Sequence, residues 1–75
     1  MHTDSLVRMA NQIGQFFEAM PDHAEALEGI ALHIKKFWEP RMRLALLTHV
    51  DAEGGAGLSS MVSEAIRDHR SLLAP

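Results

Sequence analysis

The 75-residue chain has no cysteine, only one tryptophan and no long hydrophobic run. The missing cysteines exclude disulfides and thiolate metal sites. No apolar stretch reaches the roughly 18 residues that a membrane helix needs, and no basic stretch followed by an apolar one opens the sequence. We therefore expect a cytoplasmic protein without a membrane segment. A chain this short is marginally stable alone, and a partner is then the expected stabilising aid.

Motifs that carry chemistry are also scarce. The glycine cluster at 54–57 follows no predicted strand and precedes no Lys-Ser or Lys-Thr pair, so it is not a phosphate loop. The serines fall at expected helix starts or polar faces, where nothing activates them as nucleophiles. No two of the five histidines have the helical spacing of metal ligands (His2, His23, His33, His49, His69). We expect no catalytic, cofactor-binding or metal-binding residue, and no enzyme activity from this chain by itself.

Hydrophobic periodicity predicts an all-α fold, a small bundle of four short helices. The expected helices span about 4–20, 22–37, 40–50 and 59–73, within a single domain that covers residues 1–75. Proline and glycine separate them, at Pro21, at Pro40 and in the 54–57 cluster.

Local signals refine this prediction. Asp22 and Glu25 have capping-box spacing at the start of the second helix, and Ser59 or Ser60 is the expected cap of the last one. Ala10 and Gly14 lie four residues apart at the edge of an apolar face, where small side chains allow close packing of a neighbouring helix. His49 lies near Asp51, and we expect a hydrogen-bonded surface pair there.

The segment 37–43, with sequence Phe-Trp-Glu-Pro-Arg-Met-Arg, concentrates residues that are typical of protein contact surfaces. Pro40 fixes a tight turn between the second and third helices. Two leucines of the third helix fall outside its apolar face and suggest a surface that another chain covers. The predicted partner-interface residues are Phe37, Trp38, Arg41, Arg43, Leu44 and Leu47. For Trp38 the sequence leaves a second interpretation open, a core residue at the turn between the helices.

Charge is segregated along the chain. Residues 33–49 carry a net charge of +3, and the remainder carries −6. Such asymmetry can steer association with an oppositely charged surface. The alternative function that this segment leaves open is a small helical nucleic-acid-binding module that uses residues 35–43. Three net charges are few for binding driven by phosphate contacts, and the helix that follows is rich in leucine.

The whole chain resembles the delta subunit of the bacterial NAD-dependent, molybdenum-containing formate dehydrogenases. The motifs that carry the resemblance are residues 6–14 followed by Phe16-Phe17, Ile30-Ala31 with His33, residues 37–43, and residues 54–58. The third motif is the most specific, because Trp-Glu-Pro-Arg-Met-Arg is an unusual sequence for a generic helical bundle.

The resemblance implies an accessory role without catalysis. The partner would be the large catalytic subunit, and the small chain would support its assembly, cofactor insertion or stability. The cofactors of the complex, a molybdenum pterin, iron-sulfur clusters, FMN and NAD, would all belong to other subunits. The resemblance leaves open whether the chain stays bound or acts as a transient chaperone, and whether it self-associates when isolated.

Overall fold

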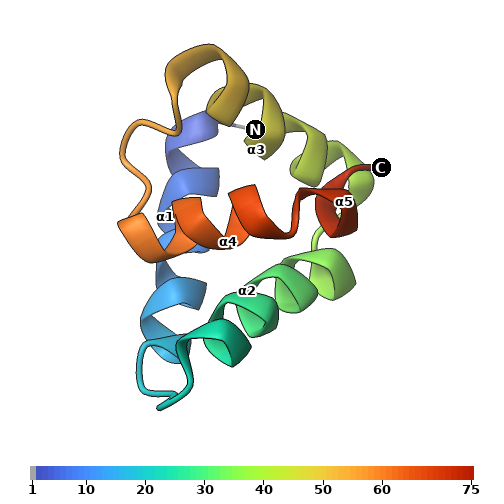
Figure 1. Cartoon of the computed structure of the whole chain (residues 1–75). Coiled ribbons are helices and arrows are strands. Elements are labelled where there is room, and N and C mark those ends of the chain that lie inside the picture. Colours follow the sequence, from blue (N-terminus) through green and yellow to red (C-terminus); the bar gives the residue numbers. More distant parts are fainter. Residues whose placement is uncertain (1) are drawn as a thin grey trace.

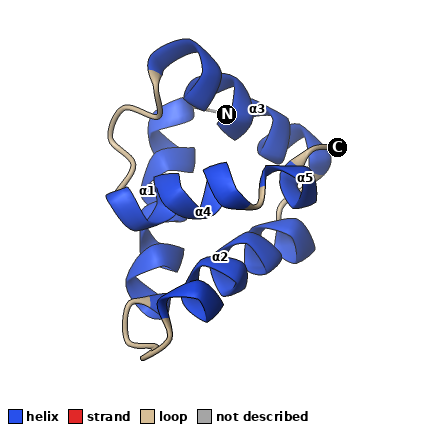
Figure 2. Cartoon of the chain, in the orientation of Figure 1, coloured by secondary structure: helices blue, strands red, loops and turns tan. Residues whose placement is uncertain are grey.

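Five helices make up most of the computed structural model, which describes residues 2–75, and no strand occurs within that range (Figure 2). The all-α prediction is therefore confirmed. The expected last helix is divided in two, so that residues 2–75 form five helices where four were predicted. In order they are α1 (Thr3–Phe17), α2 (His23–Phe37), α3 (Pro40–Glu53), α4 (Ser60–Asp68) and α5 (Arg70–Leu73).

The first three helices form the sides of a triangle, and α4 lies across it (Figure 1). Helix α1 packs against α2 and α3, whereas α4 packs against α1 and, most extensively, α2. The short α5 lies at the corner where α2 meets α3 and contacts both. The core fills the triangle beneath α4, and its fully buried large side chains are Leu6, Ile30, Ile34, Leu46, Val62, Ile66 and Leu73.

The predicted caps and close contacts occur as the sequence indicates. The Asp22 carboxylate accepts a hydrogen bond of 3.0 Å from the Glu25 amide and begins α2. Ser59, rather than Ser60, caps α4 by accepting from the Val62 amide at 3.3 Å. Gly14 is buried against α4, and a Cβ added there would come within 2.7 Å of a Val62 methyl group. The small residue is what permits the close approach of α1 and α4.

The ends of α1 and α3 lie three residues from their predicted positions, and the last predicted helix is interrupted. Helix α1 ends at Phe17 rather than at residue 20, because Pro21 has no amide hydrogen to donate to the Phe17 carbonyl and disfavours helical geometry in Met20. Helix α3 continues beyond residue 50 to Glu53, since the first residue that readily adopts the left-handed conformation is Gly54, with φ 64°.

The predicted 59–73 helix breaks at His69, whose backbone leaves helical geometry at φ −123° and ψ 31°. The break redirects the chain so that α5 reaches the corner between α2 and α3, where Leu73 is buried. No proline or glycine lies at the break. The interruption instead coincides with the packing of α5 against α2 and α3.

Candidate protein–protein interface

The turn between α2 and α3 is two residues long and holds its tryptophan inside the fold. Helix α2 ends at Phe37, Trp38 and Glu39 adopt extended backbone geometry, and Pro40 starts α3 at its first position. Trp38 is 5% exposed and belongs to the core cluster. Of the two interpretations that the sequence left open, the structure supports the core residue.

Arg43 is also an internal residue, with 8% of its surface exposed. Its Nε donates to the Leu73 carbonyl at 3.1 Å, and one terminal nitrogen donates to the carbonyls of Lys35 (3.2 Å) and Trp38 (2.9 Å). These carbonyls lie at the ends of α2 and α5, where helices leave oxygens without partners and carry partial negative charge. Arg43 therefore ties the C-terminal ends of two helices to α3.

The six residues predicted as a partner interface divide into two groups of three. Trp38, Arg43 and Leu47 are buried within the chain. Phe37 and Leu44 are 69% and 54% exposed, and Arg41 is exposed as well. The buried group builds the corner, and only the exposed group is available for direct contact with another protein.

A second set of exposed apolar residues, which the sequence analysis did not single out, lies on α1. Phe16 is 76% exposed and Met9 is 38% exposed. Both line an open groove of about 360 Å³ whose other walls include Ile13, His33 and Trp38. The adjacent Phe16 and Phe17 are the signal that could have revealed this surface, because neighbouring side chains on a helix point about 100° apart, and two large rings side by side are difficult to bury together in a small core.

Aromatic rings connect the α1 surface to Phe37. The rings of Phe16 and Phe17 meet edge to face at 5.1 Å between centroids, and Phe17 lies 6.4 Å from His33. His33 in turn lies 4.7 Å from Phe37. The ring of Phe17 also packs on Gly29, where a Cβ would meet it at 2.5 Å. A continuous row of rings thus crosses from α1 to the end of α2.

The exposed cations around the turn between α2 and α3 form no ion pairs in the described part of the chain, whereas the arginines of α4 and α5 do. Among residues 2–75, no ion pair is formed by Lys35, Lys36 or Arg41. By contrast, Arg70 lies 2.7 Å from the Asp51 carboxylate, and Arg67 pairs with Glu64 and Asp68. Lys35, Lys36 and Arg41 are therefore presented to solvent without an ion-pair partner in that range, whereas Arg43, the fourth cation of segment 33–49, is buried.

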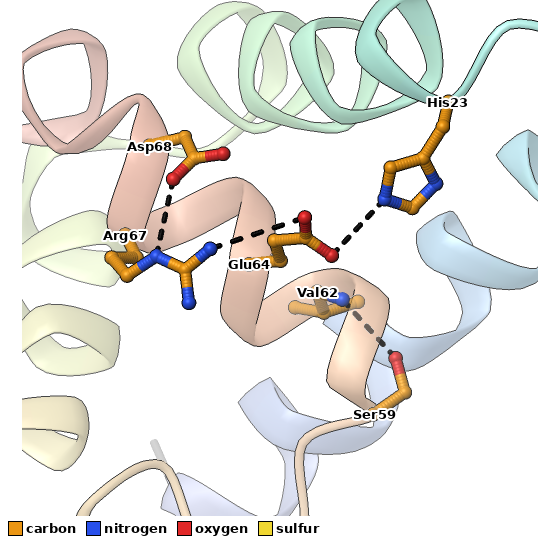
Figure 3. A network of polar contacts seen from close by, with 6 residues as sticks. All are labelled: His23, Ser59, Val62, Glu64, Arg67 and Asp68. Atoms are coloured by element: carbon orange, nitrogen blue, oxygen red, sulfur yellow. Dashed lines mark hydrogen bonds and ion pairs between the residues drawn. The ribbon is translucent and has the colours of Figure 1, made fainter.

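The pairs of Arg67 belong to a polar network that joins α4 to the start of α2 (Figure 3). His23 reaches across to Glu64 at 3.0 Å, and Glu64 lies 3.9 Å from Arg67, which contacts Asp68 at 3.1 Å. These side chains are largely solvent-exposed, so each pair contributes little to stability.

His49 does not pair with Asp51, contrary to the expectation from their spacing. It is buried, and its Nε2 lies 2.8 Å from the carbonyl oxygen of Ala56 in the glycine-rich loop. Because that oxygen can only accept, Nε2 carries the proton, while Nδ1 lies 3.4 Å from a Glu53 oxygen without a hydrogen bond. His49 holds the loop onto α3.

Two kinds of site find no support in the part of the chain that the structure describes. Residues 2–75 contain no group of three or more histidine or carboxylate side chains that could hold a metal ion. None of their helices is both long enough and apolar enough to cross a lipid bilayer.

Comparison with protein families matches residues 5–66 to the family described as the NADH-dependent formate dehydrogenase delta subunit, FdsD. The match covers well over half of the chain. The chain belongs to this family. The resemblance inferred from the sequence motifs is thereby confirmed. No curated protein and no solved structure is similar enough to add a relative to the comparison.

The part that matches the delta-subunit family includes nearly all of the described interface features. It contains the whole of α2 and α3, the turn between them, and the α1 surface around Phe16. It ends at Ile66, within α4, so that α5 lies beyond it. The exposed aromatic residues Phe16 and Phe37 both lie in the matched part.

Proposed function

We propose that this chain is a non-catalytic accessory subunit of a cytoplasmic NAD-dependent formate dehydrogenase complex. It binds the large molybdenum-containing subunit and supports the assembly, cofactor insertion or stability of that subunit. The observation that carries this proposal is the family membership, which extends over residues 5–66.

The physical properties of the chain favour a partner-dependent module. Its 75 residues provide one small core, and domains of this size retain little net stability of their own. Several large apolar side chains nevertheless remain exposed, most of all Phe16 and Phe37. Covering them in a complex removes apolar surface from water and adds stability that the isolated chain lacks.

The cofactors of the complex are assigned to the other subunits. With no cysteine, the chain cannot supply the thiolates that hold iron-sulfur clusters. Formate oxidation and electron transfer to NAD, with the molybdenum pterin and FMN, then take place in the partner subunits.

Within the six predicted interface residues, the geometry favours different roles. We assign direct contact with the large subunit to Phe37, Arg41 and Leu44, which are exposed. Trp38, Arg43 and Leu47 keep the corner rigid from inside, and a rigid contact surface loses less conformational entropy on binding.

The nucleic-acid alternative is weaker in the folded chain than in the sequence. Arg43 donates to backbone carbonyls, so the segment 35–43 presents only three cations to solvent. Each phosphate contact adds salt-dependent affinity, and three contacts provide little of it.

Co-purification from formate-grown cells tests the proposal against this alternative. The tagged chain is expected to retain the large formate dehydrogenase subunit, and cells that lack the chain are expected to yield large subunit with less molybdenum and lower formate oxidation. If the chain retains no such subunit, and its loss changes neither molybdenum content nor activity, the proposed function is wrong. Salt-sensitive retention of nucleic acid without a protein partner would support the alternative.

A further inference from the structure

The triangle formed by α1, α2 and α3 is covered by α4 on one side only. Helix α4 reaches α1 through Gly14, which packs on Val62, and through Asn11, whose side chain accepts a hydrogen bond from the Ser59 amide at 2.9 Å. Met9 and Phe16 each lie two residues from one of these positions, about 200° around the helix axis. They therefore point away from α4.

We call the residues Met9, Phe16, His33 and Phe37 the open-face patch. Met9, Phe16 and His33 line the groove of about 360 Å³, and Phe37 extends the patch through its ring contact with His33. The buried Trp38 and the partly buried Ile13 also line this groove. The patch thus combines exposed aromatic side chains with a rigid base, the arrangement found at energetically dominant positions of protein interfaces.

The charges around the patch restrict what can cover it. No carboxylate is among the residues that line the groove. Lys36 lies three residues after His33, on the same side of α2, and Arg41 follows just across the turn. Neither forms an ion pair within residues 2–75. A complementary surface is therefore apolar in the centre and carries carboxylates at the end that meets Lys36 and Arg41.

We propose that the open-face patch is the docking surface for the large catalytic subunit, and that it receives an apolar segment of that subunit flanked by carboxylates. This inference rests on the proposed function, and it places the centre of the contact on α1 and the end of α2 rather than on α3. A second copy of the chain fits the surface less well, because a symmetric pair would bring two cationic rims into the same interface.

The test compares three full-length variants in their affinity for the purified large subunit. Phe16→Ala combined with Phe37→Ala removes the two most exposed rings, and the matched control Leu32→Ala removes an exposed apolar side chain outside the groove. Leu44→Ala removes the exposed leucine of α3. Circular dichroism establishes that each variant keeps its helices.

The double variant is expected to bind at least about 30-fold more weakly, as loss of central aromatic residues does at other interfaces, while Leu32→Ala binds like the unmodified chain. Equal affinity of the double variant and the unmodified chain would overturn the assignment. So would a Leu44→Ala variant that binds more weakly than the Phe16→Ala, Phe37→Ala double variant, because that result would place the contact on α3.

Two further results of these binding measurements would separate failure of the proposed function from failure of the docking assignment. If the unmodified chain does not bind the large subunit at all, the proposed function itself fails. If the unmodified chain forms a dimer in light scattering, and the Phe16→Ala, Phe37→Ala variant is monomeric yet still binds the large subunit, a second copy covers the patch and the docking assignment is wrong.

Discussion

Arg43 is a buried cation whose hydrogen bonds all go to backbone carbonyls. No carboxylate pairs with it within residues 2–75, and its counter-charge is the partial negative charge at the ends of α2 and α5. A lysine at this position would lack the planar set of donors that reaches carbonyls in two directions. One side chain on α3 therefore joins three helices.

Replacing Arg43 is expected to destabilise the fold. Arg43→Met should lower the free energy of unfolding by about 3 kcal/mol, since hydrogen bonds from charged groups contribute about 1.5–3 kcal/mol each and the carbonyls would lose their partner. Urea unfolding followed by circular dichroism measures this change. The control is Arg41→Met, an exposed arginine on the same helix, for which a change within about 0.5 kcal/mol is expected. Equal unfolding midpoints for the two variants would contradict this role of Arg43.

The contacts of Arg43 and His49 also show what residue types and spacing cannot predict. Arginine next to tryptophan has the composition of a contact surface, and histidine near aspartate has that of a surface pair. Both side chains instead bind backbone carbonyls, of Leu73 and Ala56, whose positions depend on how α5 and the glycine-rich loop fold back onto α3. A carbonyl is present in every residue, so no sequence pattern marks the one that will be used.

At the scale of helices, the start of α4 is fixed by one serine of two neighbours. Ser59 accepts from the Val62 amide, whereas Ser60 is the first helical residue and is exposed. Ser59→Ala is expected to lower the free energy of unfolding by about 1 kcal/mol, the usual contribution of a helix cap. Ser60→Ala should leave it nearly unchanged. Thermal and urea unfolding of the two variants shows which serine caps the helix. A larger loss of stability with Ser60→Ala would contradict the assignment of the cap to Ser59.

The contact between α1 and α4 depends on the absence of a side chain at Gly14. Alanine favours a helix by about 1 kcal/mol over glycine, but an added methyl group would collide with Val62 at 2.7 Å. Overpacking costs about 1–3 kcal/mol, so Gly14→Ala is expected to be a net loss of about 1 kcal/mol in urea unfolding. The exposed neighbour Gln15→Ala serves as the control. A stabilised Gly14→Ala variant would show that α4 can shift without cost.

Local signals predicted the helices well where the chain itself supplies a start or a stop. Helix α2 was expected over 22–37 and spans His23–Phe37, because Asp22 caps it and Pro40 follows closely. Periodicity was less informative about exposure. Leu44 and Leu47 fall outside the predicted apolar face, yet Leu47 is buried and Leu44 is 54% exposed. The difference comes from α5, which packs on one side of α3. Arg43 reaches Leu73 of α5 from that side, and Leu47 lies one turn after Arg43.

Across the whole molecule, exposed apolar side chains and cations that form no ion pair within residues 2–75 occur together around the turn between α2 and α3, whereas the arginines of α4 and α5 are paired. Phe37 lies between Lys36 and Arg41, whereas Arg67 and Arg70 are paired. The sequence predicted the charge asymmetry, but not that aromatic residues of α1 would extend the same surface, since that depends on how α1 and α2 pack. Binding through such a surface has two contributions. The charges attract a partner before contact, and the apolar side chains stabilise the complex once the surfaces touch.

These two contributions can be separated by kinetics if the chain binds the large subunit as proposed. Neutralising Lys36 and Arg41 to glutamine should slow association and reduce its dependence on salt, because unpaired charges steer the encounter over roughly the Debye length of about 10 Å at 0.1 M salt. Neutralising Arg67 and Arg70 to glutamine removes the same number of charges, but from arginines that already form ion pairs, and should leave the association rate nearly unchanged. Surface plasmon resonance at several salt concentrations measures both rates. If the two double variants slow association equally, net charge rather than its placement governs the encounter, and the cations beside Phe37 have no particular role in it.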